Sequence, residues 1–200
     1  NVKLSSANSI NWGRLVPQIV YYFSAYADLL EKGTIAAGEA VDFCVPTGNF
    51  GDILAGYYAK RMGLPVAKLI CASNSNNVLT DFLQTGVYDK KRDFYKTISP
   101  SMDILISSNL ERLLYHETQD VALVRGWMEE LAAKGRYEVG ETVLQNLKET
   151  FWAGWVDDAA TKATIREVYE KEHYVLDTHS AVAYRVAQAY KKDTGSERLL

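Results

Sequence analysis

The sequence has few cysteines and no long apolar run, and both absences exclude functional classes. No stretch approaches the roughly 20 apolar residues that a membrane span needs, so we expect no membrane partner. The only cysteines are Cys44 and Cys71, and a zinc site would need more ligands at closer spacing. Both lie in β-like apolar runs. We therefore predict buried free thiols in a reducing compartment, a cytoplasmic location and no bound metal.

Charge of either sign is neither abundant nor concentrated. The chain has 22 Lys and Arg against 25 Asp and Glu, for a formal net charge of -3. The short basic run Lys90–Arg92 is typical of a solvated loop. A nucleic-acid-binding protein would need a basic face, so the composition predicts no nucleic-acid partner.

A start methionine is also missing from the first position. The chain opens on Asn1–Leu4, of which Val2 to Leu4 is β-like, and it stops as an apolar run begins after Gly195. We expect a fragment of a longer protein.

Apolar strand-like runs alternate with helical patterns in three units, over residues 2–30, 40–62 and 66–85. This alternation predicts the α/β class, with a parallel sheet flanked by helices. In such sheets, ligands bind outside the carboxyl ends of the strands. The first functional candidates are therefore the polar turns that follow each strand.

The rest of the chain has a different pattern. We predict an α/β core at 1–107, a helical insertion at 108–172 and a return to the core at 173–200. In the return, 174–176 is expected as a short strand, with Asp177 capping a final helix. Four aromatic residues are expected to pack the helices of the insertion together: Trp127, Phe151, Trp152 and Trp155.

The turn Pro46–Asp52 lies between a predicted strand and a predicted helix. Gly48 and Gly51 let the backbone approach a ligand closely, and the helix start offers free N–H groups and a positive dipole end. This predicts an anion site for one phosphate monoester, formed by the N–H groups from Asn49 to Asp52 and the Asn49 amide. We expect the Asp52 carboxylate to point away from the anion.

Two common phosphate motifs are excluded at this turn. It lacks the Gly-Lys-Ser/Thr ending of a P-loop. Its glycine spacing does not fit the dinucleotide fingerprint, and no acidic residue ends a following strand at the right distance.

The other polar turns contain Asn8, Ser9 and Asn11, and then Ser73–Asn77, which includes Asn74. Such residues also act as ordinary caps, but three polar turns at one sheet edge favour a pocket.

Arg14 lies in the first turn of a helix beside the loop that holds Ser9. A guanidinium at a helix start makes a strong anion clamp, although a lone arginine is often a surface ion-pair partner. His179, at another helix start, could donate to an anion or act only as a cap-region residue. Two phosphate-sized sites on one rim would suit a phosphorylated cofactor facing a phosphorylated substrate.

The chain resembles the C-terminal half of the threonine synthases of the longer bacterial and fungal type, which are fold-type II enzymes that use pyridoxal 5′-phosphate (PLP). The matching segments are Asn8–Arg14, Pro46–Asp52, Ser99–Ile104, Ser107–Leu114 and Tyr174–Val182.

The resemblance implies conversion of O-phospho-L-homoserine and water to L-threonine and phosphate, by β,γ-elimination and replacement with PLP as electron sink. It implies that the residues Gly48, Asn49, Phe50, Gly51 and Asp52 hold the PLP phosphate. It further implies that Ser9, Arg14 and Asn49 contact the substrate phosphate, and that longer members carry a helical insertion.

The same resemblance places the Schiff-base lysine in a missing N-terminal half, within a segment of the form His-Gly-Pro-Thr-x-x-Phe-Lys-Asp, so no catalytic residue is expected in this chain. The fragment alone is then expected to be inactive. Two alternatives remain: a non-catalytic phosphate-binding α/β module, or a related enzyme such as threonine deaminase or cysteine synthase.

Overall fold

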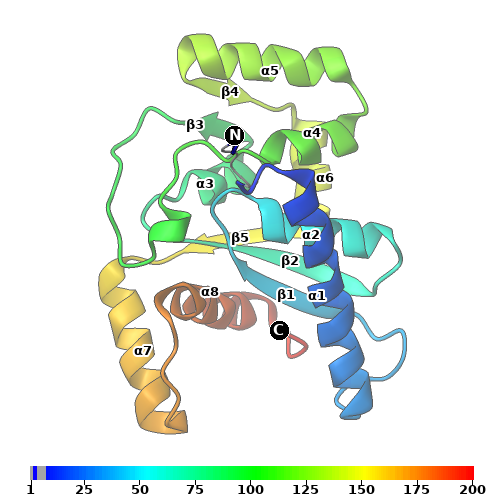
Figure 1. Cartoon of the computed structure of the whole chain (residues 1–200), viewed down its shortest axis with the longest axis vertical. Coiled ribbons are helices and arrows are strands. Elements are labelled where there is room, and N and C mark those ends of the chain that lie inside the picture. The colour runs from blue at the N-terminus through cyan, green and yellow to red at the C-terminus, as the bar shows by residue number, and fades with distance from the viewer. Residues whose placement is uncertain (1, 4–7) are drawn as a thin grey trace.

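The centre of the fold is a three-stranded parallel sheet. The computed structural model describes residues 2–3 and 8–200, and Figure 1 shows its element order. Strand β2 (Val66–Ser73) lies between β1 (Val41–Pro46) and β5 (Phe151–Trp155), and both neighbours run parallel to it. A nearly continuous apolar run gives β2 its central place, because a central parallel strand is buried on both faces. The predicted α/β class with a parallel sheet is confirmed.

The last residues of the chain extend this sheet by a short pairing. Leu199 forms a parallel bridge with Asp42 of β1. The Asp42 N–H donates to the Arg198 carbonyl at 2.7 Å, and the Cys44 N–H donates to the Leu200 carbonyl at 2.7 Å. The backbone of β1 is thus paired on both sides along part of its length.

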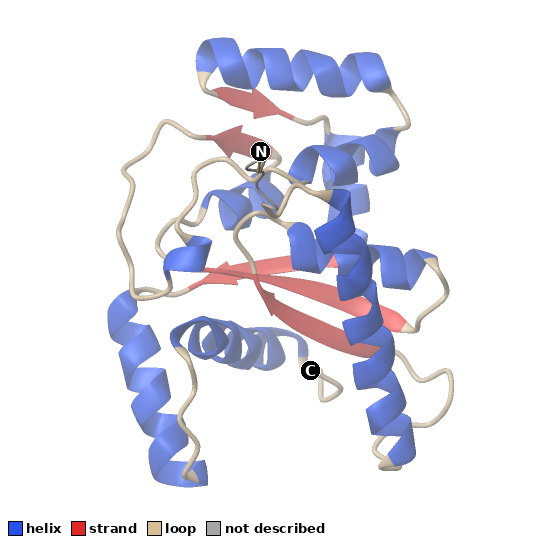
Figure 2. Ribbon diagram, in the orientation of Figure 1, coloured by secondary structure: helices blue, strands red, loops and turns tan. Residues whose placement is uncertain are grey.

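Helices cover both faces of the sheet. On one face lie α1 (Trp12–Glu31), α2 (Gly51–Arg61) and α3 (Val78–Thr85), whose apolar side chains share one core with the sheet. On the other face lies α8 (Thr178–Thr194), which packs Val182 and Val186 against Ile70 of β2. Figure 2 shows the sheet between these two layers. The carboxyl ends of β1 and β2 therefore open at one rim of a covered sheet.

A smaller layer packs beyond α3. It contains an antiparallel pair, β3 (Val87–Asp89) and β4 (Arg136–Glu138), in which Tyr88 and Tyr137 stack at 5.3 Å. The Trp127 ring of α5 stacks on the Tyr137 ring of β4, with centroids 6.1 Å apart. Trp127 thus packs its helix against a strand, and its predicted role between helices stays a prediction. The remaining elements are η1 (Pro100–Met102), α4 (Leu110–Thr118), α5 (Val121–Lys134), α6 (Glu141–Thr150) and α7 (Asp158–Glu172).

The predicted helical insertion at 108–172 also contains two strands, since residues 136–138 form β4 and residues 151–155 form β5 of the main sheet. Phe151 is buried against Phe50, and Trp152 contacts Tyr190 of α8 edge-on at 5.3 Å. Trp155 is half exposed. Aromatic residues favour strands as much as they fill helical cores, so the aromatic run Phe-Trp-Ala-Gly-Trp was open to both interpretations. The predicted boundaries of the three parts stay a prediction.

The predicted strand at 174–176 is also wrong. Tyr174 and Val175 are exposed and unpaired in the described structure, because no neighbouring strand runs beside them. Asp177 nevertheless caps α8, accepting bonds from the His179 and Ser180 N–H groups at 2.9 and 3.2 Å. At the other end, Leu4 of the predicted strand at 2–4 lies outside the described residues, and Val2 and Lys3 form no strand.

Both cysteines are free. Burial raises the pKa of both thiols, that of Cys71 to about 12. Cys71 is fully buried, whereas Cys44 is only partly so. Over the residues that the structure describes, no helix has the length and apolar character to cross a membrane.

Gly56, in the middle of α2, should not tolerate alanine. A Cβ there would lie 2.6 Å from the Tyr22 ring of α1 and 2.9 Å from Leu69 of β2. Alanine usually stabilises a helix interior, but overpacking costs about 1–3 kcal/mol. We expect Gly56→Ala to lower the free energy of unfolding, measured by urea denaturation. Gly126→Ala is the control, because its new Cβ has no atom within 4 Å, and we expect it to leave the free energy of unfolding unchanged or higher. Equal effects at both positions would contradict the packing argument.

Candidate functional site

The turn between β1 and α2 has an unusual backbone. Phe50 precedes α2 with a φ of 61°, in the left-handed region. Bulky residues rarely adopt this conformation, and the buried Phe50 ring, packed against Phe151, holds it there. The first helical bond runs from the Leu54 N–H to the Phe50 carbonyl at 3.2 Å. The N–H groups that precede Leu54 in α2 are therefore left without an acceptor inside the helix.

Gly48 is required by a close contact across the rim. A Cβ on Gly48 would lie 2.6 Å from the Ser101 carbonyl oxygen and 3.2 Å from the Met102 Cα. Both obstacles are backbone atoms, so they cannot rotate aside. Only glycine fits where the turn approaches η1.

The carbonyl groups of the turn are held by the segment before α4. The Gly48 oxygen accepts a bond from Ser107 Oγ at 3.0 Å. The Asn49 oxygen accepts two, from the Asn109 N–H at 3.1 Å and from Asn109 Nδ2 at 2.8 Å. A trans peptide holds its N–H opposite to its C=O. The N–H groups of Asn49 and Phe50 therefore point away from residues 107–109.

The turn lines a cavity of about 400 Å³ together with the start of α1. Ser9 and Arg14 face this space along with residues 46–53. The structure thus brings together the turn and the two residues predicted from a separate loop. Backbone N–H groups, a helix N-terminus and a guanidinium around one small space are features that suit an anion.

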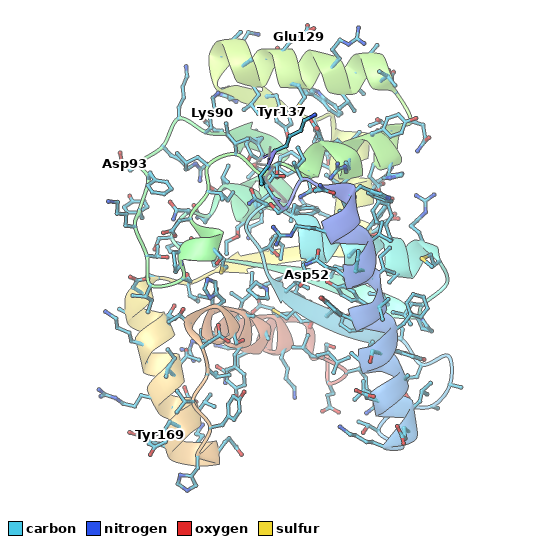
Figure 3. The ribbon with its side chains drawn as sticks, in the orientation of Figure 1. Asp52, Lys90, Asp93, Glu129, Tyr137 and Tyr169 are labelled. Carbon is cyan, nitrogen blue, oxygen red and sulfur yellow. The ribbon has the colours of Figure 1, made fainter. Side chains whose placement is uncertain are left out.

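Asp52 is tied to α1 while it lines the cavity. The Tyr22 hydroxyl donates to the Asp52 carbonyl at 2.9 Å and to Oδ1 at 3.2 Å. Figure 3 labels Asp52. Burial raises the pKa of this carboxyl, and the bond from Tyr22 partly opposes that shift. The bond from Tyr22 holds one carboxyl oxygen of Asp52 toward α1. Asp52 still lines the cavity, so the expectation that its carboxylate points away from an anion stays a prediction.

Three of the predicted polar residues make other contacts. Asn11 caps α1, since its Oδ1 accepts from the Gly13 N–H at 2.8 Å. The Asn8 carbonyl accepts from the Asn11 N–H at 3.0 Å. The buried Asn74 side chain donates to Thr97 and Asp103, each at 2.8 Å. None of the three lines the described cavity, and their contacts are those of capping and loop-holding residues.

His179 contacts the rim without lining the cavity. Its Nε2 accepts from the Ser101 N–H at 3.2 Å, and Ser101 borders the cavity. Because Nε2 is the acceptor, the neutral ring carries its proton on Nδ1. That atom faces Asp177 Oδ1 at 3.4 Å. His179 therefore holds the η1 side of the cavity in place.

Four residues that the sequence did not suggest take part in the site. Gln18 lines the cavity one helical turn after Arg14, and this i, i+4 spacing could have revealed it. Ser101 borders the cavity from η1, while Ser107 and Asn109 hold the turn from behind. These three lie in the segments Ser99–Ile104 and Ser107–Leu114, which resemble the family, but no local pattern gave them a role beside the turn.

The chain is similar to threonine synthases along nearly its whole length. It is 48% identical over 193 residues to human threonine synthase-like 1, covering 96% of this chain and 26% of that protein. It is 43% identical to the threonine synthase of Eremothecium gossypii, covering 90% of this chain and 37% of that protein. No family model matches.

A solved threonine synthase structure is also similar to this chain. The crystal structure of PLP-bound threonine synthase from Brucella melitensis is 46% identical and superposes with a TM-score of 0.89, over 98% of this chain and 41% of that one. The chain is thus similar to threonine synthases in sequence and shares their α/β fold. It spans 26–41% of the length of these three proteins.

Replacement of Gly48 should damage the anion site more than the fold. In Gly48→Ala, the clash with Ser101 must displace the turn and its N–H groups. We expect the affinity for inorganic phosphate, measured by isothermal titration calorimetry, to fall roughly tenfold, or about 1.4 kcal/mol. Gly140→Ala is the matched control, since nothing lies within 4 Å of its Cβ. Unchanged phosphate affinity in Gly48→Ala would exclude the turn as the site.

Proposed function

We propose that this chain is the phosphate-binding part of a threonine synthase. The enzyme would convert O-phospho-L-homoserine and water to L-threonine and phosphate with PLP as cofactor. The observation that carries the proposal is the single cavity shared by the glycine turn, Ser9 and Arg14. The similarity to threonine synthases, one of them solved with PLP bound, supports it.

The turn fits the phosphate monoester of PLP. Its carbonyls face residues 107–109, so the N–H groups of Asn49 and Phe50 are available on the other side. The first turn of α2 adds further N–H donors and the positive end of a helix dipole. Residues 48–52 would therefore hold the cofactor phosphate. When bound, PLP supplies an electron sink for breaking bonds at the substrate carbons.

Ser9, Arg14 and Asn49 would hold the phosphate of the substrate. A hydroxyl, a guanidinium and an amide give that group several donors, and charge-assisted bonds to phosphate are the strongest of these. They would orient the substrate and stabilise the charge of the departing phosphate. One oxygen of the Asp52 carboxyl accepts a bond from the Tyr22 hydroxyl, which ties that carboxyl to α1.

The proposed reaction needs residues outside these 200. No lysine of the sequence lies in a segment of the form His-Gly-Pro-Thr-x-x-Phe-Lys-Asp. The lysine that bonds PLP would belong to another part of the protein, and residues 1–200 alone would not catalyse the reaction. The two free thiols fit a reducing compartment, so we infer a cytoplasmic enzyme.

Two other functions are less well supported. The absence of a lysine-bearing segment favours a non-catalytic phosphate-binding module. A solved threonine deaminase has a related structure, but at 13% identity and a TM-score of 0.54 the likeness concerns the fold alone. The Arg14 and Ser9 side of the cavity favours a substrate that carries its own phosphate.

The full-length protein should release L-threonine and inorganic phosphate in equal amounts from O-phospho-L-homoserine when PLP is present. Both products can be quantified by amino-acid analysis and a phosphate assay. The separate chain of residues 1–200 should release neither. Absence of turnover in the full-length protein with bound PLP would eliminate the enzyme proposal and favour the binding module.

Loss of Arg14 should act mainly on substrate binding. We expect Arg14→Ala in the full-length protein to raise the KM for O-phospho-L-homoserine by roughly 10- to 100-fold, because a charge-assisted hydrogen bond contributes about 1.5–3 kcal/mol. Steady-state kinetics measure this change. Arg166→Ala, on the exposed surface of α7, is the matched control and should leave KM unchanged. An unaltered KM in Arg14→Ala would remove Arg14 from the site.

A further inference from the structure

Asn109 is a buried asparagine that begins a helix without capping it. It is 0% exposed and precedes α4, yet its side chain makes no capping bond to that helix. Asparagine at this position usually accepts a bond from the first turn, which contributes about 0.5–2 kcal/mol. The Asn109 side chain therefore serves another part of the structure.

The Asn109 amide joins two loops that are far apart in the sequence. Its Nδ2 donates to the Ser9 carbonyl at 3.0 Å and to the Asn49 carbonyl at 2.8 Å. An amide nitrogen has two hydrogens, so each loop receives one. Both Ser9 and Asn49 line the cavity. One side chain thus connects the loop before α1 to the turn before α2.

Arg112 holds the other end of this amide. Its Nη1 donates to Asn109 Oδ1, and its Nη2 donates to the Ile10 carbonyl at 2.8 Å. Its guanidinium also lies over the Trp12 ring at 6.0 Å. Because arginine only donates and carbonyls only accept, the orientation of the Asn109 amide is fixed. Arg112 supports the Ser9–Ile10 loop and makes no bond to the glycine turn.

Ser107 supports only the opposite loop. Its hydroxyl donates to the Gly48 carbonyl at 3.0 Å, and its N–H donates to the Tyr88 hydroxyl at 2.9 Å. The three residues around the start of α4 therefore have different roles. Ser107 holds the glycine turn, Arg112 holds the Ser9–Ile10 loop, and Asn109 holds both.

We propose that Asn109 is a positioning residue that sets the relative placement of the two phosphate sites. Cofactor affinity and substrate affinity would then depend together on a side chain that lines neither site. The identity of the two ligands rests on the proposed function. The linkage of the two loops rests on the contacts of Asn109 alone.

Three variants of the full-length protein separate these roles. The PLP dissociation constant is measured by titrating the apo-protein, and KM and kcat for O-phospho-L-homoserine by steady-state kinetics. We expect Asn109→Ala to raise both the PLP dissociation constant and KM roughly tenfold. Ser107→Ala should raise the PLP constant alone. Arg112→Gln removes the direct bond to the Ile10 carbonyl and also the support of the Asn109 amide, so it should raise KM more than the PLP constant.

A purely structural role would give a different pattern, with a lower melting temperature and unchanged constants in the folded protein. Thr80→Ala is the matched control, since it removes a buried bond to the Gly154 carbonyl (3.1 Å) away from both loops. Asn109→Asp keeps the size but removes the donors, so it should not restore either constant. A change in only one constant, or in neither, for Asn109→Ala overturns the proposal.

If Asn109→Ala does not fold, the double variant Ser107→Ala/Arg112→Gln decides. It should reproduce both losses, and retention of either wild-type constant overturns the proposal. Inorganic phosphate distinguishes this test from that of the enzyme. If the wild type shows no turnover but Asn109→Ala binds inorganic phosphate more weakly, the positioning role is supported and the enzyme proposal is removed. Turnover with constants insensitive to Asn109 removes the positioning role alone.

Discussion

The site depends on the hydrogen bonds that turn the Gly48 and Asn49 carbonyls away from the cavity. A peptide group carries a donor and an acceptor on opposite sides, so an anion cradle needs its carbonyls satisfied elsewhere. Residues 107–109 provide those donors from a segment 59 or 60 residues later in the chain. Without them, the same peptide groups could rotate and present oxygen atoms to an anion. The glycine at position 48 contributes in a second way, because it allows η1 to close the rim.

The cavity has few charged side chains, although the proposed function requires it to hold two phosphate groups. Neutral backbone donors and a helix N-terminus act on one side, and Arg14 lies on the other. Fixed dipoles of this kind need no reorganisation when a charged ligand arrives. Holding the turn in this conformation costs backbone strain, because Phe50 has a left-handed φ. The packing of the buried Phe50 ring offsets that strain.

The sequence contained the parts of the site that lie within single turns. Pro46–Asp52 showed its glycines, its preceding strand and its following helix in one continuous stretch, and Arg14 stood at a recognisable helix start. Ser101, Ser107 and Asn109 could not be inferred in the same way, because their contribution is a tertiary contact and an isolated serine or asparagine is locally an ordinary cap. Strand β5 was hidden for a related reason. Its aromatic residues suit a helical core equally well, and only pairing with Leu69 to Ser73 distinguishes the two. Features set by neighbouring residues in the sequence could thus be predicted, whereas features set by contacts between distant residues could not.

The short pairing of residues 198–200 with β1 has a consequence for aggregation. Without it, the outer side of β1 would present unpaired N–H and C=O groups, and an open strand of this kind can pair with another copy. The buried Asp42 also accepts bonds from the Tyr190 hydroxyl of α8 and from the Ser196 hydroxyl just before the final stretch. A charged residue on an exposed edge discourages such pairing, but here the same carboxylate also anchors the covering segment. The final stretch therefore covers part of an edge with which another copy could otherwise pair.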